Sequence, residues 1–380
     1  MSELTTMQKR DLAARGYSRR MFGRAAALVT AGAALPFYNE PALAQLSMIG
    51  PLPPDAVKIN ANEYPLGPCP EAAEAIYGVV KKGGRYLYEE TFTFARTLAD
   101  QEGVTPDAVL AFAGSSDPLH RSVLAFTSPT RSLVMGDPGY EAGARAAEFV
   151  GAKVIRVPLR KDHSHDVRAM AAADPDAGLI YICNPNNPTG TVTSKADLDW
   201  LVANKPKGAI VLIDEAYIHF SETPASSYMV AAGKDVVVLR TFSKLYGMAG
   251  LRAGAAIARA DLLAKIRPYG AGALPVTGMT GALTSLKVSN LVAERRKLNR
   301  RTRDDLFDFL TRHNFKFVPS ESNCFMLDAK RPAQEMVKAM AAEKVFIGRV
   351  WPAWPTYTRI TIGTPDEMEK FKAALLKVNA

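Results

Sequence analysis

The chain has 380 residues, of which 48% are apolar and 22% charged, and its formal net charge is +9. A chain of this length can bury one large hydrophobic core and a smaller one, as two-domain α/β proteins do. Three cysteines cannot form a disulfide framework, and the moderate positive charge suits anionic substrates without identifying them.

The first 44 residues have the organisation of an export signal. A twin arginine, Arg19-Arg20, precedes an apolar stretch at 25–37 and an Ala-x-Ala site that ends at Ala44. This order is typical of secretory signals, and the paired arginines resemble the twin-arginine type. We therefore expect the twin-arginine machinery to export the protein to the periplasm, with cleavage after Ala44 and no membrane anchor left. A basic amphipathic N-terminal helix is the alternative.

Strand and helix patterns divide the remaining chain into three parts. Residues 45–75 are expected to form an irregular, Pro-rich arm, and 76–272 a large domain with a mostly parallel sheet and helices on both faces. Residues 273–380 are expected to form a smaller α+β domain. Gly270-Ala271-Gly272 and Pro275 mark a candidate hinge between the two domains.

Two polar segments do not indicate a ligand. His163 and His165 lie in a polar loop without a third cluster of metal ligands, which favours a surface loop over a metal site. The basic run at 294–303 follows a helical pattern without interleaved aromatic residues. A solvated helix face is therefore favoured, and we expect no nucleic-acid partner.

Two apolar runs are predicted to be buried strands that end in polar residues. The run 178–183 precedes an Asn- and Pro-rich turn at 184–190, and the run 209–213 ends at Asp214. Ligands bind at this end of parallel strands, and a carboxylate there is costly without a partner. A pyridinium nitrogen would be such a partner. The alternatives are an ordinary turn, a helix N-cap or the metal-binding aspartate of a nucleotide hydrolase, although no Gly-Lys-Ser/Thr loop occurs upstream.

The stretch 241–252 is the most informative part of the chain. Lys244 lies between the hydroxyl residues Thr241 and Ser243 and the guanidinium of Arg252. An amine that forms a Schiff base needs a partly dry site with positive neighbours, and hydroxyl and guanidinium groups are ligands for a phosphate. The stretch therefore indicates pyridoxal phosphate. Taken alone, a lysine in a Gly-rich loop is more often a solvated surface residue.

The chain resembles the fold-type I pyridoxal phosphate enzymes, the class I and II aminotransferases, in the order and spacing of Asn187, Asp214, Lys244, Arg252 and Arg359. The segments 60–68 and 359–364 make it most similar to the histidinol-phosphate aminotransferase group. The resemblance implies an α/β fold with a mostly parallel, seven-stranded sheet and a smaller α+β domain. It also implies ping-pong transfer of an amino group between an amino acid or amino-alcohol phosphate, histidinol-phosphate-like or aromatic, and a 2-oxo acid. A decarboxylase or lyase of the same fold, or an exported binding protein without catalysis, are the alternatives.

The resemblance also implies roles around the cofactor ring. Lys244 would bind pyridoxal 5'-phosphate covalently and move a proton at the substrate α-carbon. Asp214 would keep the ring nitrogen protonated, and Asn187 and Tyr217 would hydrogen-bond the phenolic oxygen. Tyr140 would stack on the ring face.

The segment 114–118 looks like a strand-to-helix turn with free amide groups facing an anion. The implied phosphate ligands are Ser115, Ser116, Thr241, Ser243 and Arg252. Tyr64 would reach the phosphate in the neighbouring subunit, which implies a homodimer; local packing is the alternative.

Two arginines are implied for the substrate. Arg359 and Arg349 would hold its anionic end. Trp351 and Trp354 follow Arg349 closely, and they could either line an aromatic pocket or stiffen a surface loop.

Overall fold

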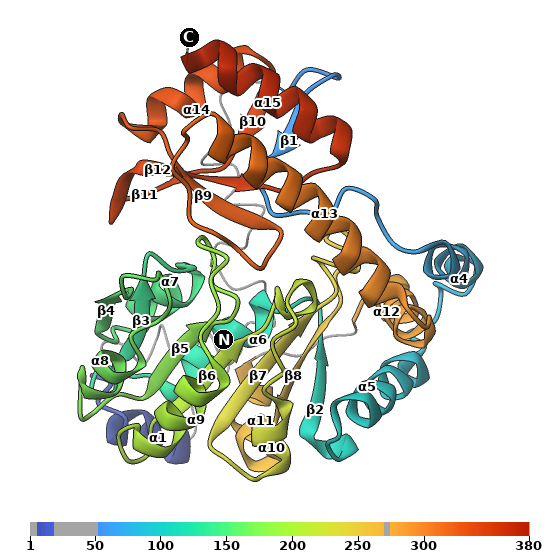
Figure 1. Ribbon diagram of the computed structural model, residues 1–380. Helices are drawn as coiled ribbons and strands as arrows, with labels where there is room; N and C mark the ends of the chain where they lie inside the picture. The colour runs from blue at the N-terminus through green and yellow to red at the C-terminus, as the bar shows by residue number, and fades with distance from the viewer. Residues whose placement is uncertain (1–5, 19–51, 270–273, 380) are drawn as a thin grey trace.

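The computed structural model describes residues 6–18, 52–269 and 274–379 (Figure 1). The twin arginine, the apolar stretch 25–37, the cleavage site at Ala44 and the hinge glycines 270 and 272 lie outside these residues. In Figure 1 a larger α/β part carries a smaller α+β part above the end of its sheet.

The larger part is built on one seven-stranded sheet in the order β2-β8-β7-β6-β5-β3-β4. Only β8 runs antiparallel to its neighbours, so the predicted mostly parallel sheet is confirmed. The strands are β2 (Val109–Phe112), β3 (Leu133–Asp137), β4 (Val154–Pro158), β5 (Leu179–Cys183), β6 (Ile210–Asp214), β7 (Val236–Thr241) and β8 (Gly254–Ala258). The four strands β5 to β8 are buried at every position, which explains their near-continuous apolar sequences.

Helices cover both faces of this sheet. Alternate residues of β6 point to opposite faces, with Leu212 in one hydrophobic cluster and Val211 in the other. The first face is covered by α6 (Ser116–Phe126), α7 (Ala142–Phe149) and α11 (Ala260–Ile266). The second is covered by α5 (Tyr88–Glu102), α8 (Val167–Ala172), α9 (Lys195–Asn204), α10 (Ser227–Ala231) and α12 (Val276–Lys287), with α4 (Pro70–Val80) packed on α12. Short 3-10 turns are η2 (Pro106–Ala108), η3 (Ile218–Phe220) and η4 (Arg267–Tyr269).

The smaller part has two small sheets and three helices around its own core. β9 (Cys324–Asp328), β11 (Val350–Trp351) and β12 (Trp354–Thr361) form an antiparallel sheet, and β1 (Val57–Ile59) pairs in parallel with β10 (Val345–Ile347). The helices are α13 (Leu291–Arg312), α14 (Ala333–Ala342) and α15 (Pro365–Asn379).

Two expectations for this region differ from the structure. The arm 45–75 is not irregular throughout, because Val57 and Ile59 of β1 enter the small core and α4 begins at Pro70. A three-residue strand is too short to show an alternating pattern in the sequence. The basic run on α13 is only partly solvated, because Arg295 and Arg303 are buried.

The N-terminal helix α1 (Thr6–Ala14) packs against the larger part. Leu12 and Tyr17 join the cluster under α6 and α11. Arg15 donates hydrogen bonds to the Tyr269 hydroxyl and to the Leu124 carbonyl, both at 2.7 Å. The residues just before the twin arginine are therefore attached to the folded domain. Of the helices within the described residues, none combines the length and apolar character needed to cross a bilayer.

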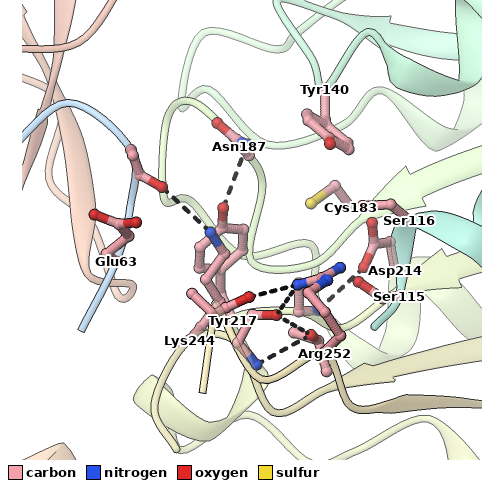
Figure 2. Close-up of a pocket in the computed structure, with 15 residues that line it drawn as sticks. Glu63, Ser115, Ser116, Tyr140, Cys183, Asn187, Asp214, Tyr217, Lys244 and Arg252 are labelled. Atoms are coloured by element: carbon pink, nitrogen blue, oxygen red, sulfur yellow. Dashed lines mark hydrogen bonds between the residues drawn. The ribbon is translucent and has the colours of Figure 1, made fainter. Parts of the chain in front are cut away.

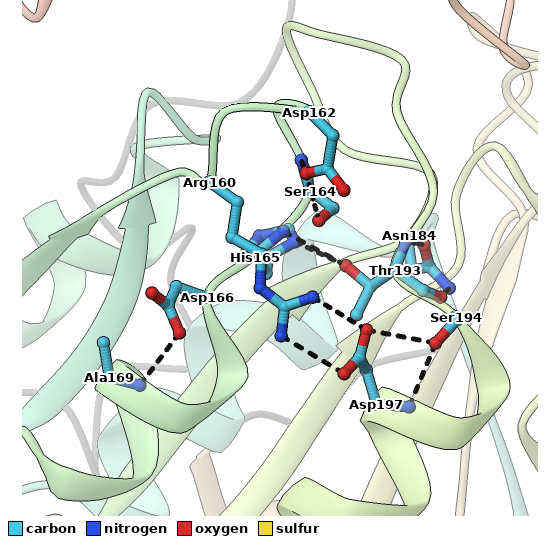
Figure 3. Close-up of polar contacts among 10 residues, drawn as sticks. All are labelled: Arg160, Asp162, Ser164, His165, Asp166, Ala169, Asn184, Thr193, Ser194 and Asp197. Carbon is cyan, nitrogen blue, oxygen red and sulfur yellow. Dashed lines mark hydrogen bonds and ion pairs between the residues drawn. The ribbon is translucent and has the colours of Figure 1, made fainter.

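The expectation of a surface loop for His165 is wrong. Its side chain is 2% exposed, and Nδ1 lies 3.0 Å from the Thr193 hydroxyl (Figure 3). The ring fits because Gly136 in β3 has no side chain, and a Cβ there would lie 2.7 Å from the imidazole. Burial lowers the pKa of His165 to about 4, so the ring is neutral at pH 7. His163 is half-buried and contacts Trp354 edge-on.

A buried ion-pair network joins β7 to the rest of the larger part. Arg240 is 1% exposed and donates to both oxygens of Glu102, at 2.7 and 2.8 Å, and to the carboxylate of Glu215. These carboxylates raise the pKa of Arg240 against the effect of burial, which lowers it. Removing the guanidinium would leave Glu215, which is fully buried, without its cation.

Replacement of Arg240 by Met should therefore lower the free energy of unfolding by about 3–5 kcal/mol. Arg259→Met, which breaks a partly exposed pair with Asp235, is the control and should lower it by about 1 kcal/mol or less. Urea-induced unfolding of the three proteins gives both values. Equal losses in the two variants would contradict this account.

Candidate active site

One pocket opens at the carboxyl ends of β5, β6 and β7, where Cys183, Asp214 and Thr241 are the last strand residues (Figure 2). Strand ends of a parallel sheet meet at one edge, which brings these distant segments together. Ten of the residues expected to bind the cofactor line the pocket: Ser115, Ser116, Tyr140, Asn187, Asp214, Tyr217, Thr241, Ser243, Lys244 and Arg252.

Asp214 is a buried carboxylate that accepts hydrogen bonds from two donors. It is 3% exposed, and it accepts from the Tyr181 hydroxyl at 3.0 Å and from the Ala216 amide at 3.2 Å. Burial raises the pKa of Asp214 to about 6, although both donors and nearby Lys244 act to lower it. The carboxylate is thus ionised at neutral pH and suited to hold a cationic ring nitrogen.

Lys244 and the phenol of Tyr217 lie together in the pocket. The Lys244 amine donates to the Ala61 carbonyl at 3.4 Å and lies 5.6 Å from the centre of the Tyr217 ring. The Tyr217 hydroxyl accepts from the Asn187 amide nitrogen at 3.3 Å. Arg359 donates to the Asn187 amide oxygen at 2.9 Å, so it orients the nitrogen of that amide toward Tyr217. This group can bind an aldehyde and its neighbouring phenolic oxygen.

The pocket also contains a site for an anion. Helix α6 begins at Ser116, and the Ser115 side chain makes no capping bond there, so the first amide groups can face a phosphate. The Thr241 hydroxyl donates to the Ser243 hydroxyl at 3.0 Å, and Arg252 donates to the same atom at 3.1 Å. Hydroxyls, amides and a guanidinium are the groups that recognise a phosphate dianion.

Gly114 is required for the position of Arg252. Its φ is +94°, a region that residues with side chains rarely adopt, and a Cβ there would overlap the Arg252 guanidinium. The guanidinium instead donates to the Ala113 and Ala249 carbonyls, at 3.1 and 2.7 Å. Arg252 is therefore fixed beside the first turn of α6.

Tyr64 lies outside this pocket. Its side chain is 7% exposed and packs near Phe220, with the Arg295 guanidinium 5.0 Å from the ring centre. The Tyr64 hydroxyl is buried without a hydrogen-bond partner among the described residues. Tyr64 therefore packs against residues of its own chain and does not reach the pocket that contains Lys244.

The two arginines that were expected to hold the substrate flank Trp351 instead of lining the pocket with Lys244. The guanidinium groups of Arg349 and Arg359 lie 4.4 and 5.5 Å from the centre of the Trp351 ring. Trp351 is 1% exposed and its indole N–H donates to the Gly139 carbonyl at 2.9 Å. Trp351 is therefore a buried contact between the two parts of the protein, whereas Trp354 is only partly buried.

Sequence reasoning missed several residues of the site. Ala61, Ala216 and Ala249 line the pocket through their place in the loops, and their types indicate no chemistry. Glu63, whose carboxylate does indicate chemistry, also lines it. Cys183 also lines it, and its register opposite Asp214 follows from adjacent parallel strands. Tyr181 lies two residues earlier in the same strand. Its contact with Asp214 could be predicted from the sequence if the two strands are taken to be neighbours. No group of three potential metal ligands comes together in the part of the chain described.

The pocket fits pyridoxal 5'-phosphate on three observations. It has a buried carboxylate for the ring nitrogen, a lysine amine for the aldehyde and an anion site at the start of α6. Together with the mixed seven-stranded sheet, this site defines a fold-type I transferase that depends on pyridoxal phosphate. When bound, the cofactor withdraws electrons from bonds at the substrate α-carbon.

Comparisons with known proteins agree with this class. The family model for aminotransferase class I and II matches residues 54–375. A histidinol-phosphate aminotransferase of Symbiobacterium thermophilum is 35% identical over 328 residues, which cover 84% of this chain and 90% of that protein. A solved protein from Erwinia carotovora atroseptica SCRI1043 is 31% identical, with a TM-score of 0.83, over 87% of this chain and 98% of that one.

A further solved structure shows the same fold with the cofactor present. It is the histidinol-phosphate aminotransferase from Sinorhizobium meliloti in complex with pyridoxal-5'-phosphate, with a TM-score of 0.78 and 24% identity. The match covers 91% of this chain and 95% of that one. The protein thus belongs to the class I and II aminotransferases. It is a transaminase similar to histidinol-phosphate aminotransferases.

The raised pKa of Asp214 predicts a pH dependence in the protein without cofactor. The folded pKa of about 6 exceeds the unfolded value of 3.8, so the folded state holds this proton more tightly. The contribution of Asp214 to stability should therefore fall by about 3 kcal/mol as pH rises from 4 to 6 and then level off.

Asp214→Asn removes this titration. The difference in unfolding free energy between wild type and Asp214→Asn, both without cofactor, should shift by this amount in favour of the variant as pH rises. Denaturant unfolding at intervals from pH 4 to 8 measures the difference. A shift in favour of wild type would show that the carboxylate is stabilised in its charged form.

Proposed function

We propose that Lys244, Asp214 and Tyr217 carry out the transamination in this pocket. The convergence of the Lys244 amine, the buried Asp214 carboxylate and the anion site at α6 on one cavity carries this proposal. Lys244 binds the cofactor and transfers the proton at the substrate α-carbon. Asp214 keeps the ring nitrogen protonated, and Tyr217 and Asn187 hydrogen-bond the phenolic oxygen.

The remaining lining residues hold the cofactor in place. Tyr140 covers one face of the ring, and the phosphate contacts Ser115, Ser116, Thr241, Ser243 and Arg252. The hydrogen bonds among Thr241, Ser243 and Arg252 support this, because they orient the three side chains before an anion binds. Orientation in advance reduces the reorganisation that binding requires.

The donor is an amino acid or an amino-alcohol phosphate, and the acceptor is a 2-oxo acid. Both pass through the same pocket in turn, as a ping-pong cycle requires. Arg359 lies one hydrogen bond from Asn187 and therefore from the cofactor site, which supports its role at the anionic end of the substrate. The similarity to histidinol-phosphate aminotransferases supports this range of donors.

Lys244→Ala should lower the rate of amino transfer by more than about a hundredfold, because it removes both the attachment point and the proton carrier. The control is Lys287→Ala, which removes an exposed lysine on α12 and should leave the rate unchanged. Amino transfer from an amino-acid panel to 2-oxoglutarate measures both. Circular dichroism checks that the variants fold, and unchanged turnover in folded Lys244→Ala would refute the assignment.

The protein forms a homodimer with shared active sites in this proposal. Tyr64 extends to the cofactor phosphate of the neighbouring subunit. Its buried hydroxyl without a partner in the described chain supports this role, because a buried hydroxyl is seldom left without a hydrogen bond. A phosphate oxygen of the neighbouring site would accept from it.

We also propose that the protein is exported to the periplasm by the twin-arginine machinery and cleaved after Ala44. This route carries folded proteins, which suits an enzyme that binds its cofactor before export. The order of the twin arginine, the apolar stretch 25–37 and the Ala-x-Ala site at Ala44 supports the proposal.

Changing Arg19 and Arg20 to Lys should keep the protein in the cytoplasm at full length, because the twin-arginine machinery recognises the arginine pair. The wild type should be found in the periplasm with a mature N-terminus at Gln45. Fractionation, immunoblotting and N-terminal mass spectrometry of both forms measure this. A control with Lys9 and Arg10 exchanged for Arg and Lys should behave as wild type. Periplasmic recovery of the twin-lysine variant would contradict twin-arginine export.

A further inference from the structure

Arg349 is already paired within the protein. The residue lies in the chain between β10 and β11, and its side chain is 6% exposed. Nη1 and Nη2 donate to the two carboxylate oxygens of Glu141 at 3.0 and 2.9 Å. This two-bond geometry is the strongest that arginine makes with a carboxylate. The group expected to hold a substrate anion therefore has a carboxylate of the protein as its partner.

Both members of the pair are held beside the pocket. Glu141 directly follows Tyr140, which lines the pocket, and precedes α7. The Arg349 guanidinium lies on the Trp351 ring at 4.4 Å, and the Trp351 indole is bonded to Gly139. Arg349 and Glu141 thus face each other at the junction of the two parts, beside the residue that covers the cofactor ring.

The pair changes the charge available to a substrate. A phosphate monoester at Arg349 would have to displace Glu141 or lie against it, and carboxylate and phosphate repel at such distances. Separating this partly buried ion pair is unfavourable, because the Arg349 guanidinium, which is 6% exposed, then lacks its partner in a poorly solvated site. An uncharged group, in contrast, meets a pair of no net charge and is not repelled by it.

We propose that Glu141 is a specificity-determining residue that selects amino donors with an uncharged side chain and disfavours donors that carry a phosphate ester. This inference rests on the proposed transaminase function of the pocket. The charge of Arg349 is then balanced from within the chain, before any substrate binds.

The same pair also connects the larger and smaller parts, so a purely structural role must be separated from specificity. If the pair only holds the two parts together, its loss should change the rate for all donors equally, because every donor uses the same pocket. A specificity residue changes the ratio between donors of different charge. The ratio of kcat/KM values for two donors distinguishes the two roles.

The experiment compares L-histidinol phosphate with L-phenylalanine as donors in half-reactions of the holoenzyme without an oxo acid. Wild type should favour phenylalanine. Glu141→Gln keeps the shape and a hydrogen-bond acceptor but frees the Arg349 charge, and it should raise the histidinol phosphate to phenylalanine ratio by roughly ten- to a hundredfold. The double variant Glu141→Gln with Arg349→Gln should lose this gain. Glu148→Gln, on the exposed side of α7, is the matched control and should leave the ratio unchanged.

Binding of inorganic phosphate to the holoenzyme, measured by titration calorimetry, provides a readout that needs no turnover. Glu141→Gln should bind phosphate more tightly than wild type, and the double variant should not. Equal changes for both donors, or an unchanged affinity for phosphate, would overturn the proposal. If wild type reacts with no donor, the transaminase assignment of the pocket fails, and the phosphate affinities alone then decide whether Glu141 screens Arg349.

Discussion

The burial of one carboxylate at the end of the central strand β6 is the constraint on which the rest of the site depends. Asp214 has no solvent to stabilise its charge, and two hydrogen bonds, from Tyr181 and the Ala216 amide, only partly replace it. Its pKa of about 6 reflects the part of the desolvation cost that these hydrogen bonds do not offset. In the proposed site a cationic ring nitrogen would offset that penalty on binding, so the cofactor and the charged form of Asp214 would stabilise each other.

The other groups of the site are fixed relative to this carboxylate by the sheet. Because β5, β6 and β7 are parallel neighbours, Cys183, Asp214 and Thr241 end at one edge. The antiparallel strand β8 then begins just after Arg252, which brings the guanidinium back to the start of α6. Gly114 leaves the space that the Arg252 guanidinium occupies. Few positions of the anion site can therefore change independently.

The smaller part contacts the larger one beside the pocket. Arg359 bonds Asn187, Trp351 bonds Gly139, and Arg349 pairs with Glu141. The first contact orients an amide toward the cofactor site, whereas the third cancels a charge. In the proposed function, cofactor chemistry and donor selection thus depend on different contacts at the same junction, and donor preference could change without altering Lys244 or Asp214.

The sequence by itself determined the strands and the cofactor group. Short apolar runs that end at Asp214 and before Asn187 predict buried strands, and Lys244 lies among hydroxyls and an arginine within twelve residues. Only the tertiary structure decided that His165 is buried against Gly136 and that β1 joins the small core. It also decided that Tyr64 lies outside the pocket of its own chain and that Glu141 pairs with Arg349. The reason is physical: hydrophobic periodicity and local motifs act over a few residues, whereas these contacts join segments far apart in the chain and depend on how the two parts pack.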